Sequence, residues 1–266
     1  MNAPQGTSYD SPASGRCSGE RLILFTRYPT AGQTKTRLIP VLGTEGAARL
    51  QRRLTLRAIR AAEGLRRARG VDLQIRFEGA ERRAMEHWLG ERFDFYPQGP
   101  GDLGAKMTRA FEESWNQDMS RIVLIGADCP GLTTEILDEA FERLREFPVV
   151  FGPAVDGGYY LVGLSQPIPQ LFSGPVWGAS TVLHDSLKIL QEAGHNTAFL
   201  RPLADVDRPE DLAVWNEIIK SEAANLSKIS VVIPALNEAS KIASTIAAAF
   251  DGRDSLVVAS SRMASY

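Results

Sequence analysis

Residues 22–38 read LILFTRYPTAGQTKTRL. The first four, Leu22–Phe25, are apolar throughout, as expected for a central strand of a parallel sheet that is buried on both faces. Thr26–Leu38 then forms a long loop before a helical pattern that starts near Gly43. In an open α/β sheet such a loop lies at the carboxyl end of its strand, where ligands bind. Its proline, its glycine and the fixed cations Lys35 and Arg37 could surround a phosphate with N–H groups and positive charge. A plain basic surface loop would have the same composition.

Beyond this loop, predicted strands and helices alternate along the chain. Strands are expected at residues 71–77, 93–96, 121–125, 149–151, 159–164 and 197–200. Helices are expected at 44–69, 80–89, 180–193 and 209–219. Two more helices are expected, one from the glycine-rich turn at 98–104 to about residue 115 and one that starts after Thr133 or Thr134. This alternation favours an α/β fold with a mostly parallel central sheet and helices on both faces.

The chain divides by composition into four parts. Residues 1–20 are rich in Ser, Gly and Pro and are expected to be a disordered tail. Residues 21–220 hold the α/β pattern, and the polar residues 221–228 are expected to be a linker. Residues 229–266 begin a second strand, loop and helix, but this stretch is too short to bury a core of that type by itself.

The totals exclude several classes of protein. A formal net charge of −2 over 266 residues provides no general basic field to hold nucleic acid. Cys17 and Cys129 lie in very different contexts, so a disulfide framework is not expected and a reducing compartment fits better. No apolar run reaches the roughly 18 residues of a membrane span, and the N-terminus has no signal-peptide pattern. We therefore expect a cytoplasmic protein; its oligomeric state is not predicted.

Acidic residues stand at predicted strand ends and turns: Asp102, Asp128, Asp156 and the pair Asp205 and Asp207. The ends of different parallel strands converge on one edge of a sheet, so these carboxylates would repel each other unless a cation joins them. Hard oxygen ligands suit Mg²⁺ or Mn²⁺, completed by substrate phosphates. With Lys35 and Arg37 opposite, the set would suit a nucleoside di- or triphosphate.

Each carboxylate also has a purely structural interpretation. Asp128 could be a turn residue, and Asp156-Gly157-Gly158 could be a tight turn. Asp207 precedes Arg-Pro-Glu and is expected to cap a helix in any case. Asp102 could cap its helix, although a helix N-terminus also suits a phosphate.

Other site types have less support. Tyr159 and Trp177 are more often packing residues than ligand platforms. His184 and His195 have no spaced partners, which argues against a zinc site. There is no Gly-x-Gly-x-x-Gly after the first strand and no Walker-type Gly-Lys-Thr, so dinucleotide oxidoreductases and P-loop ATPases fit poorly.

Five motifs occur in a recognisable order: 25–38, Gly101–Gly104 (GDLG), Gly126–Leu132 (GADCPGL), 152–161 with its Asp-Gly-Gly-Tyr-Tyr-Leu, and Asp205–Leu212 (DVDRPEDL). Over about residues 21–219 this set resembles the GT-A-fold nucleotide-diphospho-sugar transferase superfamily, which is Rossmann-like. Within it, the chain is most similar to the bacterial DUF2064 group of uncharacterised or proposed glycosyltransferases, which includes arsenosugar-biosynthesis-associated members.

The resemblance implies a metal-dependent transferase with a nucleotide-sugar donor and a small-molecule acceptor. Asp128 would be the metal-binding aspartate, with Asp207 and Asp205 as further metal-side carboxylates for Mg²⁺ or Mn²⁺. Asp128, Lys35 and Arg37 would be the catalytic set. The nucleotide would contact Thr26, Gly32, Lys35, Thr36, Arg37, Asp102 and Gly104. The sugar or acceptor would contact Asp156, Gly157, Gly158, Tyr159, Trp177, Ser180 and Thr181.

Two alternatives stay open. The Lys-Thr-Arg-Leu loop also resembles 2-phospholactate and molybdenum-cofactor guanylyltransferases, which would imply nucleotidyl transfer from a nucleoside triphosphate to a small phosphorylated or acidic acceptor. A non-catalytic nucleotide-binding module is the other alternative. The chain has Trp177–Thr181 (WGAST) where relatives often have Trp-Ser-Thr, and Asp207-Arg208-Pro209 for Asp-Thr-Pro. Residues 231–238 resemble the start of a family 2 glycosyltransferase, expected here to be truncated and inert.

Overall fold

A computed structural model describes residues 19–226 of the chain. Contacts divide the chain into two compact units, Met1–Lys220 and Ser221–Tyr266, and the fold below is that of the first. Its elements are β1 (Glu20–Arg27), η1 (Thr36–Leu38), α1 (Ile39–Arg69), β2 (Asp72–Glu78), α2 (Arg82–Leu89), β3 (Asp94–Pro97), α3 (Leu103–Trp115), β4 (Arg121–Gly126), α4 (Thr134–Arg143), β5 (Val149–Pro153), β6 (Tyr159–Leu164), η2 (Pro169–Phe172), α5 (Val182–Glu192), β7 (Thr197–Phe199), η3 (Pro209–Asp211) and the start of α6 (Leu212–Leu226).

One seven-stranded sheet organises this unit, with the strand order β3-β2-β1-β4-β6-β5-β7. β1 pairs in parallel with β2 and β4, and the outer pairs β2–β3 and β5–β7 are also parallel. Only β6 among the seven runs antiparallel to its neighbours. The turn from β5 to β6 is too short for a crossover to a parallel strand, which requires a dozen or more residues. Because all the strand pairs without β6 are parallel, the prediction of a mostly parallel sheet is confirmed.

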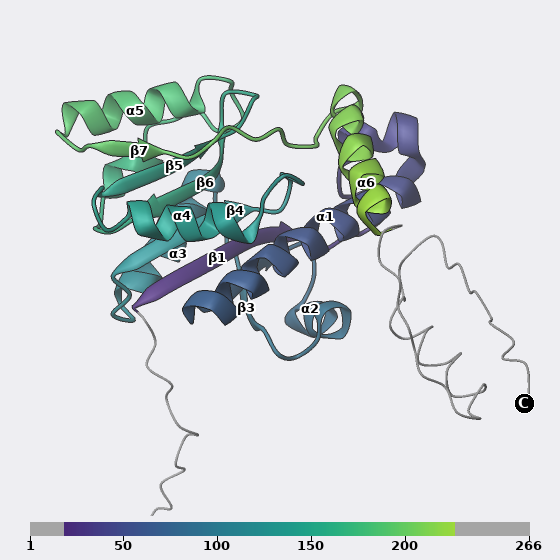
Figure 1. Ribbon diagram of the computed structural model, residues 1–266, viewed down its shortest axis with the longest axis horizontal. Coiled ribbons are helices and arrows are strands. Elements are labelled where there is room, and N and C mark those ends of the chain that lie inside the picture. Colours follow the sequence, from purple (N-terminus) through teal and green to yellow (C-terminus); the bar gives the residue numbers. More distant parts are fainter. Residues whose placement is uncertain (1–18, 227–266) are drawn as a thin grey trace, which may run out of the picture. The chain divides into compact units, whose positions relative to one another are not determined.

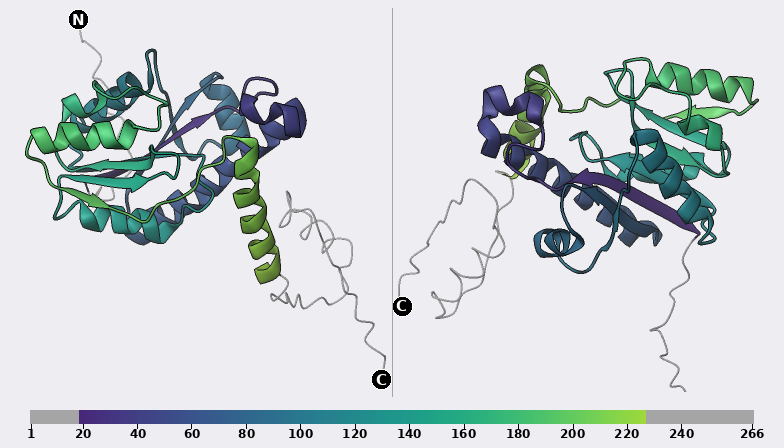
Figure 2. Two further views of the ribbon diagram at one scale, coloured as in Figure 1. Left: turned by 90° about the horizontal axis from the view of Figure 1, so that it is seen from above. Right: turned by 180° about the vertical axis from the view of Figure 1, so that it is seen from behind.

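Helices cover both faces of the sheet, as predicted (Figure 1). The side chains of β1 alternate between the two layers. Leu22 and Leu24 enter a core built with α1, α2 and α4, whereas Ile23 and Phe25 enter a core built with α3, η2 and α5. Helices α1 and α4 pack side by side on the first face, as the left view of Figure 2 also shows. Both faces of the central strand are buried, which explains its unbroken apolar sequence.

Two boundaries differ from expectation by about five residues or more. Helix α1 begins at Ile39 rather than near Thr44, and it is kinked at Gly43, whose φ of 70° and ψ of 169° are not helical. Glycine adopts such a positive φ at little energetic cost. At the other end, α6 continues to Leu226, so the first residues of the expected linker are helical. No helix within residues 19–226 is long and apolar enough to cross a membrane. The expected tail up to residue 18 and the family 2-like segment lie outside the described residues.

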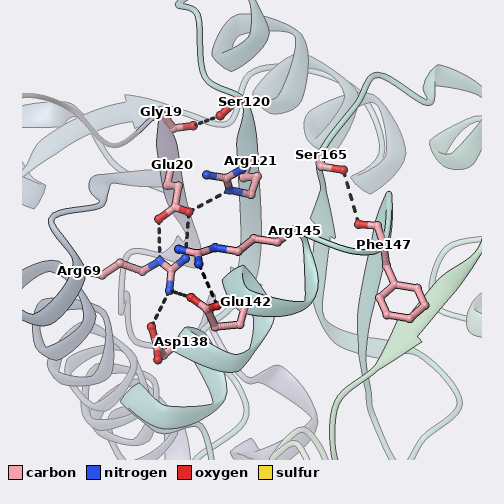
Figure 3. Close-up of polar contacts among 10 residues, drawn as sticks. All are labelled: Gly19, Glu20, Arg69, Ser120, Arg121, Asp138, Glu142, Arg145, Phe147 and Ser165. Atoms are coloured by element: carbon pink, nitrogen blue, oxygen red, sulfur yellow. Dashed lines mark hydrogen bonds and ion pairs between the residues drawn. The ribbon is translucent and has the colours of Figure 1, made fainter.

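A cluster of ion pairs links the amino end of β1 to neighbouring elements, at the edge of the sheet where the parallel strands begin (Figure 3). Glu20, whose side chain is only 3% exposed, pairs with Arg69 at 2.6 Å and with Arg121 at 2.9 Å. Arg69 also pairs with Asp138 and Glu142 of α4. Burial alone would raise the pKa of Glu20, but the hydrogen bonds from Arg69 and Arg121 outweigh it and lower the pKa. One carboxylate thus joins β1, β4 and α1.

Glu20→Gln is expected to destabilise the protein by about 2 kcal/mol at pH 7, because a charge-assisted hydrogen bond is worth more than a neutral one. A carboxyl group whose pKa is lowered by folding stabilises the native state above its ordinary pKa, 4.5, and loses that contribution as the pH falls through the folded value. The difference between variant and parent should therefore shrink below about pH 4.5 in urea unfolding curves. Glu139→Gln, which breaks an exposed pair with Arg143, is the control and should cost only a few tenths of this. An equal cost for the two substitutions would contradict this account.

Candidate nucleotide-binding site

A cavity of about 580 Å³ opens at the carboxyl ends of β1 and β4. Its walls include the end of β1, the loop before η1, the turn after β4, the β5–β6 turn, residues 177–179 with Val182, and the pair Asp205 and Asp207. The volume lies within the range of small-molecule sites. The position is the one at which open α/β sheets bind ligands.

Lys35 lines this cavity and has an uncommon backbone conformation. Its φ of 48° and ψ of 44° are left-handed, which costs a non-glycine residue roughly 1–2 kcal/mol. Its side chain is only 4% exposed, and its Nζ lies 2.9 Å from Oδ1 of Asp128 and 3.8 Å from Oδ1 of Asp207. The loop is held on both sides, because Thr34 Oγ1 donates to the Thr30 carbonyl and Leu38 is fully buried. Strain that the surrounding structure enforces in this way is typical of functional sites.

The same conformation aligns backbone donors. Left-handed Lys35 is followed by the right-handed turn of η1, an arrangement whose successive N–H groups form a concave anion-binding surface. Within residues 19–226, the N–H groups of Lys35, Thr36 and Arg37 show no hydrogen bond to the protein. They are therefore available to a ligand.

Two carboxylates face this loop. Arg37 forms an ion pair with Asp207, which is 35% exposed, while Asp128 is 48% exposed. The segment bearing Asp207 is fixed, because the Val206 N–H donates to the Asp128 carbonyl at 3.0 Å and the Val206 side chain is buried beside Leu38. One small hydrophobic cluster thus anchors both the cationic loop and the acidic segment.

The prediction that Asp207 caps the following helix is wrong. The N-cap is Arg208, and it is the carboxylate of Asp211 that accepts hydrogen bonds from the N–H groups of Asp207 and Arg208, at 3.0 and 2.7 Å. Asp211 provides this cap from within the first turn. As a result, the Asp207 carboxylate is free to face Lys35 and Arg37.

A second pair of carboxylates, Asp156 and Asp205, also lines the cavity. Burial, and then the negative charge of Asp156, raises the pKa of Asp205 to about 6. Asp156 accepts a hydrogen bond from the Gly158 N–H at 2.9 Å, which closes its turn. The β5–β6 turn is tied to the segment before Asp205, because the Val155 N–H donates to the Leu203 carbonyl at 3.1 Å.

Negative charge exceeds positive charge around the cavity. Its lining includes three cationic side chains and five acidic ones: Arg27, Lys35 and Arg37 against Glu78, Asp128, Asp156, Asp205 and Asp207. Within residues 19–226, no group of three or more His, Cys, Asp or Glu side chains gathers as a metal-binding cluster. The protein alone therefore presents a surplus of negative charge to any anionic ligand.

Comparison with known proteins finds a family model and solved structures that this chain resembles. The model of DUF2064, described as an uncharacterized protein conserved in bacteria, matches residues 61–179. A crystal structure of a proposed nucleotide-diphospho-sugar transferase from Desulfovibrio desulfuricans G20 is 28% identical, with a TM-score of 0.70 over 81% of this chain and 100% of that chain. Residues 61–179 of this chain thus match the DUF2064 family model, and the chain as a whole resembles a nucleotide-diphospho-sugar-transferase-like structure.

More distant structures share the fold. A nucleotidyl transferase from Methanothermobacter is 16% identical, with a TM-score of 0.54 over 76% of this chain and 98% of that chain. The 4-diphosphocytidyl-2C-methyl-D-erythritol synthase of Anaerococcus prevotii is 8% identical, with a TM-score of 0.52 over 78% and 100%. No curated protein matched the chain in sequence. At these identities the likeness extends to the fold alone.

Most of the residues predicted for the site line the cavity. They are Thr26, Lys35, Thr36, Arg37, Asp128, Asp156, Gly158, Tyr159, Trp177, Asp205 and Asp207. Six others stand outside the lining: Gly32, Asp102, Gly104, Gly157, Ser180 and Thr181. Of these, Asp102 caps α3 by accepting from the Ala105 N–H at 2.8 Å, and Thr181 donates to Asp185 at 2.9 Å.

Sequence reasoning missed five charged or amide side chains of the lining: Arg27, Gln33, Gln51, Glu78 and Gln98. Arg27 pairs with Glu78 across β1 and β2. The amide of Gln98 donates to the carbonyl oxygens of Thr26 and Arg76 at 3.1 and 3.2 Å, which fixes its orientation. Arg27, Glu78 and Gln98 all stand where a parallel strand ends. Position at a strand end, rather than a motif, was the signal that could have found them.

Proposed function

We propose that this protein is a metal-dependent transferase that uses a nucleotide-sugar donor. The observation that carries the proposal is the left-handed Lys35, whose ammonium group lies where Asp128 and Asp207 converge, while the N–H groups of residues 35–37 have no partner among residues 19–226. Both features serve a diphosphate: the N–H groups donate hydrogen bonds to its oxygens, and the carboxylates suit the cation that accompanies it.

The donor set fits a magnesium or manganese ion. Mg²⁺ is usually held by one or two carboxylates together with substrate phosphates and water, not by an all-protein cage. Asp128 and Asp207 supply two such carboxylates within 4 Å of one ammonium nitrogen. Bound there, the ion would neutralise the diphosphate as it leaves. It would also offset the surplus negative charge of the cavity, which explains why the donor would need it.

The chain's own groups have separate roles in this proposal. The N–H groups of residues 35–37 orient the diphosphate, and Lys35 and Arg37 stabilise the charge that develops on it. Asp128 and Asp207 hold the metal-side position, with Asp205 nearby. Asp156 and the aromatic residues Tyr159 and Trp177 face the sugar or acceptor. Catalysis would then rest on position and charge, without a covalent intermediate on the protein.

Nucleotidyl transfer is the second candidate, and Arg27 is the observation that favours it. A triphosphate needs a fuller set of cations than a diphosphate, and Arg27 adds a third to the lining. However, Glu78 already balances the charge of Arg27. We therefore place nucleotide-sugar transfer first. Product analysis separates the two, because a glycosyltransferase releases a nucleoside diphosphate or monophosphate and a nucleotidyltransferase releases pyrophosphate.

A thermal-shift screen of nucleotide-sugars and nucleoside triphosphates tests the proposal. A preferred ligand at about 100 times its dissociation constant should stabilise the protein by about 2.7 kcal/mol. The shift should require Mg²⁺ or Mn²⁺ and should be lost in EDTA. A protein that no nucleotide stabilises, with or without metal, would refute the proposal.

A further inference from the structure

Apolar and aromatic side chains form one side of the cavity, here called the acceptor wall: Leu103, Tyr159, Trp177, Ala179 and Val182. Tyr159 and Trp177 meet edge to face, with ring centroids 6.4 Å apart. Two of these residues, Trp177 and Ala179, belong to the irregular segment between η2 and α5. Such a segment needs anchors to hold a defined surface, and two glycines provide them.

Gly104 is the first anchor. It lies in the first turn of α3 with an ordinary helical backbone, where glycine weakens a helix relative to alanine. Packing explains its presence. A Cβ at this position would overlap the carbonyl oxygen of Phe172 and lie 2.5 Å from Nε1 of Trp177. The segment and its indole ring therefore sit directly on the helix backbone.

Gly157 is the second anchor. Its φ of +93° favours glycine, and a Cβ there would overlap the carbonyl oxygen of Ser180. Its own carbonyl accepts from the Leu183 N–H at 3.1 Å. The segment is thus seated at one end on α3 and at the other end on the turn that carries Asp156.

We propose, on the basis of the function proposed above, that Gly104 and Gly157 are positioning residues that hold Trp177 and Asp156 together as the binding surface for an uncharged, hydroxyl-bearing acceptor such as a sugar or polyol. The C–H face of a sugar suits the apolar wall. An ionised carboxylate only accepts hydrogen bonds, so Asp156 requires donors such as hydroxyl groups. A phosphorylated or carboxylated acceptor would bring its charge against Asp156 and Asp205.

The first arm of the test measures the position of Trp177 without any ligand. Acrylamide quenching is compared in the parent and in Gly104→Ala, each with and without Trp177→Phe, so that the difference reports Trp177. We expect Gly104→Ala to raise the quenching of Trp177 about twofold or more, because the indole can no longer rest on α3. Gly64→Ala is the matched control: its Cβ would overlap Oγ1 of Thr134, far along α1 from the cavity. Unchanged quenching in Gly104→Ala would overturn the proposed anchoring.

The second arm measures ligands. UDP and GDP with Mn²⁺ should bind Gly104→Ala within about twofold of the parent, whereas methyl α-D-glucopyranoside, measured by saturation-transfer NMR on the nucleotide-loaded protein, should lose about fivefold or more. Trp177→Ala, which inserts no atom, should show the same split if Gly104→Ala folds poorly. Glucose 6-phosphate should bind more weakly than the neutral glycoside. Equal binding of the two sugars, or binding of neither, would overturn the acceptor class. A parent protein that binds no nucleotide would instead contradict the proposed function and leave the quenching result to decide the anchoring.

Discussion

Asp128→Asn will remove the metal-dependent part of nucleotide affinity and leave the fold intact. The substitution keeps the size and one acceptor of the side chain but removes the negative charge that faces Lys35 Nζ at 2.9 Å. We expect affinity for UDP or GDP in the presence of Mn²⁺ to fall about 100-fold or more, to the level that the parent shows in EDTA. Isothermal titration calorimetry with and without metal measures both levels.

The control for this substitution is Asp94→Asn, at the exposed start of β3 and at the opposite end of the strands from the cavity. It should leave affinity unchanged. Because Asp128 is about half exposed, the free energy of unfolding of Asp128→Asn should stay within about 1 kcal/mol of the parent. An Asp128→Asn protein that binds nucleotide with Mn²⁺ as well as the parent would remove Asp128 from the metal site.

Lys35→Met will weaken nucleotide binding by a similar factor, about 100-fold, but with a different signature. The methionine keeps the apolar stem and the left-handed backbone, so the N–H groups of residues 35–37 remain in place while the charge is lost. Binding should still respond to Mn²⁺, because Asp128 and Asp207 persist. It should also depend less on salt, because one cation no longer faces the phosphates.

Titrations of Lys35→Met at two salt concentrations and two metal conditions give these results, with Lys188→Met on the exposed side of α5 as the control. Retention of full affinity in Lys35→Met would show that Lys35 only pairs with carboxylates. Loss of the metal response would show that Lys35 also shapes the metal site.

The elements that could be predicted from sequence are those whose signal is local. β6 has the predicted bounds, Tyr159–Leu164, because its apolar run follows a glycine turn that fixes its start. β1 was recognisable as central because both of its faces are apolar. The gathering of Asp128, Asp156, Asp205 and Asp207 around one cavity follows from a general rule about strand ends, and the structure places all four in its lining.

The features that could not be predicted depend on tertiary contacts or on a choice between two residues with the same local signal. Asp207 and Asp211 are both placed to cap the helix that follows Arg208, and only the folded geometry shows that Asp211 does so. The left-handed backbone of Lys35 has no local signal, because glycine usually takes that conformation. Arg27 and Glu78 become partners only when β1 and β2 align. The closeness of Gly104 to Trp177 is likewise a tertiary contact.

The most direct test of a metal-dependent nucleotide site is the electron paramagnetic resonance signal of free Mn²⁺, titrated with protein alone and with protein plus UDP or GDP. Two carboxylates that already face the Lys35 ammonium should bind the ion weakly on their own and more tightly when phosphates complete the coordination. We predict that nucleotide tightens Mn²⁺ binding about tenfold or more, and by linkage that Mn²⁺ tightens nucleotide binding by the same factor. Nucleotide that binds equally well in EDTA, with no effect on the Mn²⁺ signal, would contradict the account.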